Sequence, residues 1–584
     1  MTSKKSSALK SESKPKVKEQ PVLPEQPILS ERVVQAVVAQ EKIGQPEEKA
    51  VGEKMRIKPS HLWSIAIFLG LMFDYLFWEQ ILGINYAIFL ILCLIGGLFV
   101  LISSGLKPAL NSLFLIAPSV FFIIIAFFRQ EPLTVFLAYS LSLFSVGLFA
   151  VTYVGGRWAF YRLSNYFRKF FLLLGDMIAR PLGFIRQTRK EQLERGVDTK
   201  RPFMWGLLRG LLMALPIVFC LGSLLTSADL VFNQKMDDFF KEFTFEKITE
   251  NIQRLVLIVG YAYLLAGTFL HSALRSGDDK LIGEDKPLIK PFWGFTETAV
   301  ILVSVSLLFL AFVIVQFQYF FGGETNIGIA GYTYSQYARR GFNELVTVAF
   351  FSLVLILSLS SLTRWENELQ RKIHTGLNIL LIALVLIILV SAYQRISLGI
   401  DWHGFSRLRL YPRIFLIWLG LLFVAVIALE LARLERHFAF AVVLASFGFA
   451  ASLALFNVDA AIAQHNVFRA WHGKNLNIPH LASLSTDAIP ALAEEFLSPS
   501  LPEETREGVG AILACYKYFE DDPHISPYDW RSFNLSRWKA HEALKTIRPH
   551  LAGYVVKYNK WPVRIQTPSN ILYNCQDYTN RGED

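Results

Sequence analysis

Long apolar stretches separated by shorter polar segments run from about residue 61 to residue 456. Most of them reach the roughly 20 residues that an α-helix needs to cross a bilayer. Hydropathy therefore predicts about eleven spans, and hence an all-α fold built as a polytopic transmembrane helical bundle. The predicted spans cover residues 61–80, 84–104, 109–128, 133–155, 205–227, 253–272, 293–318, 342–362, 375–394, 412–432 and 438–456.

Polar regions flank the spans. Residues 1–58 are rich in Lys, Glu, Gln, Pro and Ser, so they cannot bury enough apolar surface to fold and are predicted to be disordered. The first apolar run begins near His61, too late for a cleavable signal peptide. The predicted domains are a tail (1–58), a four-span region (59–156), a basic loop (157–204), a seven-span core (205–456) and a C-terminal helical extramembrane domain (457–584).

The charge of the loops predicts the orientation. Residues 157–203 carry eleven Lys and Arg against four acidic residues, whereas residues 228–252 carry three Lys against six acidic residues. Lys and Arg concentrate in cytoplasmic loops, so the first loop is predicted to be cytoplasmic and the second external. Counting spans from these loops places the N-terminal tail inside the cell and the C-terminal domain outside it.

Composition agrees with a membrane protein and argues against nucleic-acid binding. The chain is 53% hydrophobic and only 18% charged, whereas soluble proteins carry about 25% charged residues. Its net charge of +10 fits an excess of Lys and Arg in cytoplasmic loops. No folded basic module with interleaved aromatic residues is present, so the lipid bilayer, and no nucleic acid, is the predicted partner.

Two of the four cysteines, Cys515 and Cys575, lie in the C-terminal domain, whereas Cys93 and Cys220 lie within apolar spans. A disulfide between Cys515 and Cys575 is permissible if the domain is outside the cell. Two unpaired thiols are the alternative, and the sequence does not decide between them.

Arginines gather where the predicted topology places the outer face. The segment YSQYARRGFNEL puts Arg339 and Arg340 directly before a predicted span, and the external loop RISLGIDWHGFSRLRLYPR contains Arg407 and Arg409. Such clusters run against the preference of Lys and Arg for the cytoplasmic side. Their charge must therefore be compensated by a partner.

Two interpretations account for these arginines. In the first, acids pair with them: Glu344 lies four residues after Arg340, on the same helix face, and Asp229 is on the same predicted side. In the second, they bind an anion or an anionic lipid headgroup, because Arg forms bidentate contacts with phosphate and carboxylate. The candidate binding residues are Arg339, Arg340, Glu344, Arg407, Arg409 and Asp229.

Asp74 lies within the first span, where a carboxylate costs about 2.5–3.5 kcal/mol and is a functional candidate by default. It could equally be protonated or reach the outer interface. The histidines predicted to be external show no H-E-x-x-H or other compact ligand spacing. No catalytic residue, metal site or cofactor is therefore predicted.

Five stretches in a fixed order resemble a known family. They are LLTSADLVF, QFQYFFGG, YTYSQYARRGFNEL, GFSRLRLY and NVDAAIAQHNVFRA followed by NIPHLASLSTDAIPAL. Together, over residues 205–495, they resemble a large family of bacterial multi-pass membrane proteins known as domains of unknown function 4153 and 4173. The resemblance implies a bacterial inner-membrane protein and brings no catalytic residues.

Three classes of function remain. The favoured one is a non-enzymatic sensor, scaffold or partner-binding component of the cell envelope, because no catalytic constellation is recognisable. A membrane glycosyltransferase or phosphotransferase acting on a lipid-linked substrate is the first alternative. The second is a transporter or flippase, for which inverted repeats and midplane charges would be expected.

Overall fold

The computed structural model describes residues 57–194, 245–277, 291–321, 342–521, 529–558 and 563–575, together with scattered positions between 210 and 235. The predicted tail up to residue 56, most of the predicted span 205–227, and Arg339 and Arg340 lie outside the described residues. Residues 57–584 group into one unit by their contacts.

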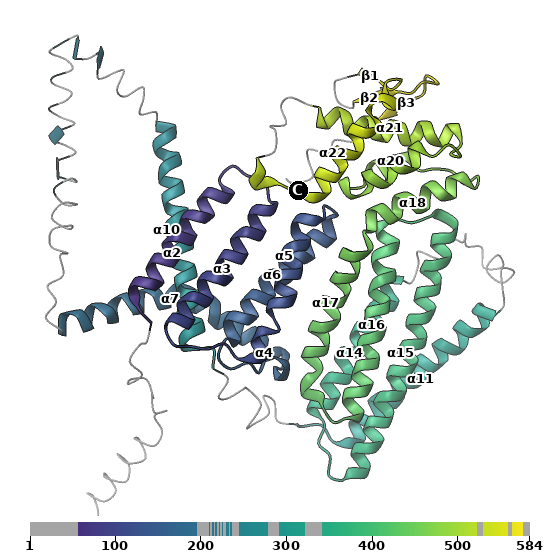
Figure 1. Cartoon of the computed structure of the whole chain (residues 1–584). Coiled ribbons are helices and arrows are strands. Elements are labelled where there is room, and N and C mark those ends of the chain that lie inside the picture. The colour runs from purple at the N-terminus through teal and green to yellow at the C-terminus, as the bar shows by residue number, and fades with distance from the viewer. Residues whose placement is uncertain are drawn as a thin grey trace, which may run out of the picture. The chain divides into compact units, whose positions relative to one another are not determined.

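Ten helices among the described residues are long and apolar enough to cross a membrane. The chain is thus an all-α polytopic membrane protein, as the sequence predicts (Figure 1). The helices are α2 (Pro59–Phe77), α3 (Ile84–Ser103), α5 (Ile116–Phe128), α6 (Pro132–Thr152), α10 (Phe245–Leu274), α11 (Phe295–Phe321), α14 (Phe342–Leu362), α15 (Glu368–His403), α16 (Arg407–Leu431) and α17 (Phe438–Phe456), with the one-turn α4 (Leu110–Leu113) leading into α5.

The predicted basic loop contains a helix. Residues Leu163–Glu194 form the 32-residue helix α7, which follows the short 3-10 helix η1 (Trp158–Phe160). Its Lys and Arg residues hide its periodicity from a hydropathy scan, although apolar residues recur along it every three or four positions. In Figure 1, α7 runs across the direction of α10, against which it packs.

The predicted external loop after the ninth span is also mostly helical. Helix α15 continues to His403, and α16 begins at Arg407, so only residues 404–406 connect them. Arg395 is consequently a helical residue, 8% exposed, whose guanidinium donates to Gln316 on α11 at 2.7 Å. Ile396 and Ile400, four residues apart on one helix face, are buried and extend the packed face of α15 beyond the predicted end at residue 394.

The C-terminal domain is helical with a small sheet that the sequence analysis did not predict. Its strands have only three or four residues and form an antiparallel sheet in the order β1-β2-β3. The elements are α18 (Val458–Trp471), α19 (Ile478–Ala482), η3 (Thr486–Ala488), α20 (Ile489–Leu497), α21 (Glu503–Glu520), η4 (Trp530–Ser532), α22 (Leu535–Ile547), η5 (Arg548–Leu551), β1 (Val555–Tyr558), β2 (Arg564–Gln566) and β3 (Leu572–Asn574), while η2 (Glu435–His437) precedes α17.

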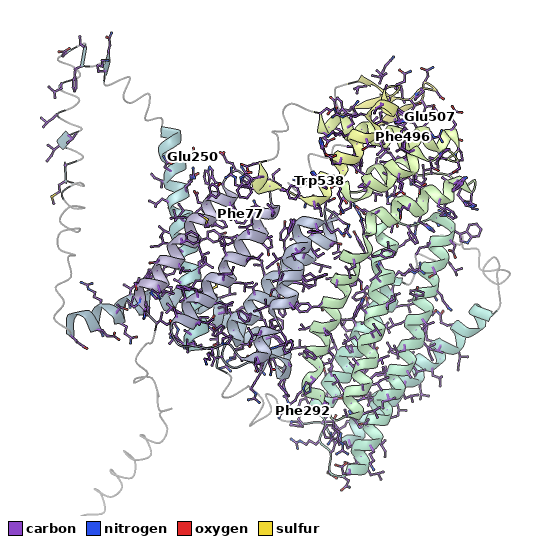
Figure 2. All side chains as sticks on the ribbon, viewed as in Figure 1. Phe77, Glu250, Phe292, Phe496, Glu507 and Trp538 are labelled. Carbon is purple, nitrogen blue, oxygen red and sulfur yellow. A yellow bond between two sulfur atoms is a disulfide. The ribbon has the colours of Figure 1, made fainter. Side chains whose placement is uncertain are left out.

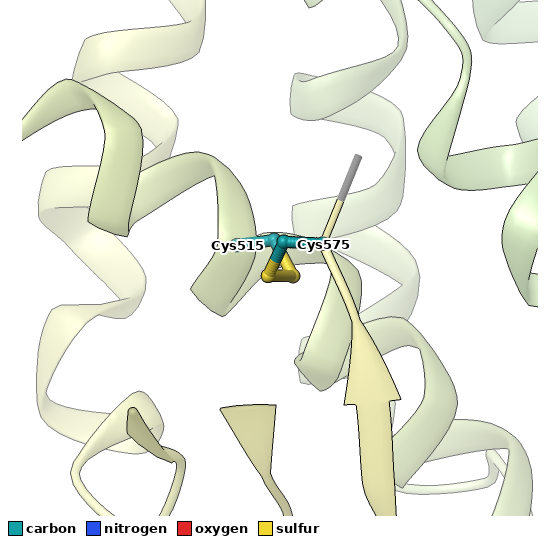
Figure 3. Close-up of a disulfide and its surroundings, with 2 residues drawn as sticks. All are labelled: Cys515 and Cys575. Atoms are coloured by element: carbon teal, nitrogen blue, oxygen red, sulfur yellow. A yellow bond between two sulfur atoms is a disulfide. The ribbon is translucent and has the colours of Figure 1, made fainter. Parts of the chain in front are cut away.

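Two sets of contacts hold the sheet against α21. A disulfide joins Cys515 on α21 to Cys575, directly after β3 (Figure 3). The buried carboxylate of Glu507 (Figure 2) accepts hydrogen bonds from the Thr567 hydroxyl at 3.1 Å and from the backbone N–H of Ser569 at 3.0 Å. Side-chain contacts with α21 therefore hold the sheet in addition to the short ladders between its strands.

Candidate functional site: the junction of the spans and the C-terminal domain

A buried ion pair joins the start of α16 to the start of α18. Both oxygens of Asp459, which is completely buried, accept from the guanidinium of Arg407, with Arg407 Nε 2.8 Å from Oδ1. Asp459 Oδ2 also accepts from the backbone N–H of Ser485 at 2.7 Å. Arg407 thus binds a carboxylate in the bidentate way for which arginine is suited, and the carboxylate belongs to the same chain.

The loop between α5 and α6 meets the C-terminal domain through Asp487. This carboxylate is 5% exposed and accepts from the backbone N–H groups of Gln130 at 2.7 Å and Glu131 at 2.9 Å. The guanidinium of Arg129 lies 3.9 Å away. Burial raises the pKa of the Asp487 carboxyl above its usual value, while the N–H of Gln130 acts in the opposite direction.

Glu131 connects the same loop to α16. Its buried carboxylate caps α6 by accepting from the backbone N–H groups of Leu133 at 2.9 Å and Thr134 at 2.7 Å, which satisfies donors that a helix start leaves unpaired. The hydroxyl of Tyr411 on α16 donates to the same carboxylate. Helix α6, helix α16 and the C-terminal domain are therefore linked by a continuous hydrogen-bonded network.

The short connection between α15 and α16 is shaped to accept α18. Asn466 exchanges two hydrogen bonds of 2.9 Å with the backbone of Phe405, and the ring of His465 stacks on Phe405 at 3.9 Å. Gly404 has φ +78°, and a Cβ there would lie 2.2 Å from Asn466 Oδ1. Only glycine permits this turn and this close approach.

The α2–α3 loop also contacts the C-terminal domain. The backbone N–H of Ile84 donates to Phe533 at 2.8 Å, Ser532 donates to Gln80 at 2.9 Å, and a Cβ on Gly83 would lie 2.6 Å from the Phe533 carbonyl. The C-terminal domain thus contacts the ends of spans that are far apart in the sequence.

Each predicted site residue that the structure describes has contacts of its own. Arg407 pairs with Asp459, a partner that the sequence-based network did not include. Arg409 donates to the Gly404 carbonyl at 3.1 Å. Asp229 is exposed and accepts from Val231 N–H at 2.7 Å. Glu344 is exposed in the first turn of α14, while Arg339 and Arg340 are outside the described residues.

Asp74 has a partner that sequence reasoning missed. The guanidinium of Arg254, in the early part of α10, binds both carboxylate oxygens of Asp74, with Nη2 2.7 Å from Oδ2. The same guanidinium lies 5.3 Å from the ring of Trp78. Asp74 is 7% exposed, so this pair compensates a carboxylate inside a span. The sequence does contain a signal for this pair, because Arg254 lies near the start of the predicted span 253–272.

A second polar group lies at the other ends of α15 and α16. The amide nitrogen of Asn378 lies 3.2 Å from the Glu430 carboxylate, 3.2 Å from the His374 ring and 3.1 Å from Ser360. All but Ser360 are buried. Four polar side chains thus meet between α14, α15 and α16, and Asn378 Oδ1 and His374 Nδ1 have no hydrogen-bond partner among the described residues. Within the described ranges, no group of three or more His, Cys, Asp or Glu residues is arranged to hold a metal ion.

Comparison with known proteins assigns the chain to a family. A family model described as Domain of unknown function (DUF4153) matches residues 116–495. The chain belongs to the DUF4153 family. No curated protein and no solved structure matches it.

The DUF4153 match begins earlier than the predicted resemblance, at the first residue of α5, and it ends within α20. Glu131, Arg407, Asp459 and Asp487 all fall inside it, whereas α2, α3 and the disulfide-bonded sheet fall outside. The motifs GFSRLRLY, NVDAAIAQ and LSTDAIPAL supply the network around Arg407 and Asp459. Three of the motifs that resemble the family thus meet at the junction.

Proposed function

We propose that this DUF4153 protein is a non-enzymatic component of a bacterial cell envelope, in which the spans hold the C-terminal domain rigidly at the outer face of the inner membrane for a protein partner. The proposal rests on the observation that the charged residues of the family-like motifs bind other groups of the same chain. Arg407 and Asp459 bind each other, and Asp487 binds backbone groups of the α5–α6 loop. These side chains support a docked domain rather than line a substrate site.

Orientation supports an external domain. Helix α7, with most of the Lys and Arg of the basic segment, packs on the half of α10 that ends at Leu274, whereas the junction lies at the opposite ends of the spans. A cytoplasmic α7 leaves the C-terminal domain on the outer side. The disulfide between Cys515 and Cys575 supports this side, because such bonds persist in oxidising compartments outside the cytoplasm.

In-cell photo-crosslinking tests the proposal. A photoreactive amino acid is placed at Leu572 on β3 and, as a matched control, at Leu434, which has the same 46% exposure but precedes η2 at the other end of the spans. We expect a discrete protein adduct from the Leu572 probe that the Leu434 probe does not give. If the Leu572 probe gives no protein adduct, the partner-binding role is wrong.

Variants of the ion pair separate docking from chemistry. Arg407→Ala leaves the buried Asp459 without its cation and should cost about 3 kcal/mol, near the lower end for breaking a buried pair, because the Arg407 side chain is 23% exposed. The adduct should then weaken. Replacing both charges by neutral residues, Arg407→Met with Asp459→Asn, keeps an amide oxygen to accept from the Ser485 N–H and should restore most of the stability and the adduct. A stable double variant that lacks the adduct would favour a role for these charges in catalysis or ligand binding.

A further inference from the structure

Helix α7 carries a stripe of exposed apolar side chains although it is not one of the ten candidate spans. The stripe residues recur every three or four positions and therefore lie on one face of the helix. A contiguous row of exposed apolar side chains can mark an interaction site. The stripe consists of Phe167 (66% exposed), Phe171 (70%), Leu174 (57%), Ile178 (64%) and Leu182 (50%).

The other faces of α7 have different neighbours. Tyr166, Leu173 and Phe184 are buried and lie roughly 130° around the helix from the stripe, at 100° per residue. Exposed cations flank the stripe on its other side: Arg168, Arg186 and Lys190 lie within about 120° of its centre, and Arg189 lies in line with it. One face thus meets protein, the next is apolar, and the third is basic.

Contacts with α10 fix where α7 lies along that helix. A Cβ on Gly267 would lie 2.4 Å from the Met177 carbonyl, so the two helices touch through their backbones. Asp176, 7% exposed, binds His271 at 2.8 Å. Gly267 precedes Leu274, the end of α10, by seven residues, or about 10 Å of helix. Amphipathic helices that lie in a membrane interface are immersed by about 5–10 Å.

We propose that α7 is an in-plane membrane helix that binds anionic phospholipid on the face of the bilayer opposite the C-terminal domain. Its stripe meets acyl chains, and its flanking cations meet phosphate headgroups. The position set by the α10 contact and the charge beside the stripe both select a lipid surface. Asp176 and Gly267 hold the helix to the spans, so that the lipid contact is part of the folded protein.

Accessibility of a spin label tests the acyl contact. Nitroxides are attached at Phe171→Cys, in the stripe, and at Gln187→Cys, an exposed polar position of the same helix, in full-length protein in phosphatidylcholine–phosphatidylglycerol nanodiscs. At position 171, relaxation by oxygen should exceed relaxation by a water-soluble nickel chelate, and at position 187 the order should reverse. Exclusion of both relaxants at position 171 would mean that protein covers the stripe, and dominance of nickel there would place it in water. Either result overturns the proposal.

Charge variants test the headgroup contact. Native mass spectrometry measures phosphatidylglycerol retained by Arg189→Gln with Lys190→Gln and by a matched pair in α22, Lys539→Gln with Lys545→Gln, both exposed. Each cation near a charged membrane contributes about 1 kcal/mol, or fivefold in affinity. We expect the α7 pair to weaken retention by at least about tenfold and the α22 pair to leave it unchanged. Equal retention by the two variants would contradict anionic-lipid binding by α7.

Discussion

The charged residues of this chain show what a sequence reveals about a single side chain and what it withholds. Hydropathy identifies Asp74 as a carboxylate that needs compensation, but its partner Arg254 is 180 residues away. Asp459 stands inside a recognisable motif, yet only the fold places it on Arg407, 52 residues earlier. The need for a partner is thus a local property that can be predicted. The identity of the partner depends on helix packing and cannot.

Histidines of the junction give it a pH dependence. Burial lowers the pKa of His480, and the charges of Arg407 and Arg409 lower it further. A hydrogen bond with the Phe405 backbone and the charge of Asp459 act in the opposite direction. Because the folded pKa is below the unfolded value of about 6.5, stability is complete above that pH and is lost as the pH falls through the folded pKa. Melting curves should therefore shift down between about pH 7 and about pH 5, and less so in His480→Gln.

The same substitution at His472, an exposed residue directly after α18, provides the control and should leave the pH profile as in the wild type. His465 should add to the loss of stability at low pH, because burial and the charges of Arg469 and Arg413 lower its pKa. The charge of Asp401 acts in the opposite direction. Superimposable profiles for wild type and His480→Gln would show that the proton binds elsewhere.

Among the elements, the apolar spans are predictable and the amphipathic ones are less so. The predicted ends of 342–362 and 438–456 coincide with α14 and α17, because an unbroken apolar run bounded by polar residues leaves little freedom. Helix α7 and the last turns of α15 escaped prediction because their charged faces lower the hydropathy. The sheet escaped because three-residue strands carry no periodic signal and are held by Glu507 and a disulfide.

The disulfide should determine whether the sheet stays on α21. Cys515 and Cys575 are separated by 60 residues, and closing such a loop stabilises a fold by about 2–4 kcal/mol. Cys575→Ser should lower the melting temperature and make the segment after α22 sensitive to protease, while the spans remain protected. Thermal melting and limited proteolysis of the purified protein measure both effects.

Reducing agent supplies the control for this prediction. It should shift the wild type to the behaviour of Cys575→Ser and leave the variant itself unchanged. A reductant effect of equal size in both proteins would assign the loss to something other than this bond.

At the scale of the whole molecule, hydrogen bonds define two ends. The backbone of Gly155 donates to Ser276 at 2.9 Å, which joins the end of α6 to the end of α10, whereas Asp74 and Arg254 join the end of α2 to the early part of α10. The loops of α2–α3 and α5–α6 meet the C-terminal domain. The basic helix α7 and the C-terminal domain therefore belong to opposite ends.

Cysteine labelling tests this arrangement in cells. A membrane-impermeant maleimide should label Trp530→Cys, which is 55% exposed in the wild type, in intact cells, and Gln187→Cys only after the membrane is opened. The reverse pattern would invert the proposed orientation. Labelling of both in intact cells would contradict the two-ended arrangement itself.

The contact between Asp487 and the backbone of Gln130 spans 357 positions of the chain. A ribosome adding about 5–20 residues per second needs roughly 20–70 seconds to cover that distance. During this interval α5 and α6 are already made, but the amides between them lack their carboxylate. The C-terminal domain thus completes hydrogen bonds of spans that were made much earlier, and a nascent chain that has not reached residue 487 leaves the amides of Gln130 and Glu131 without this acceptor.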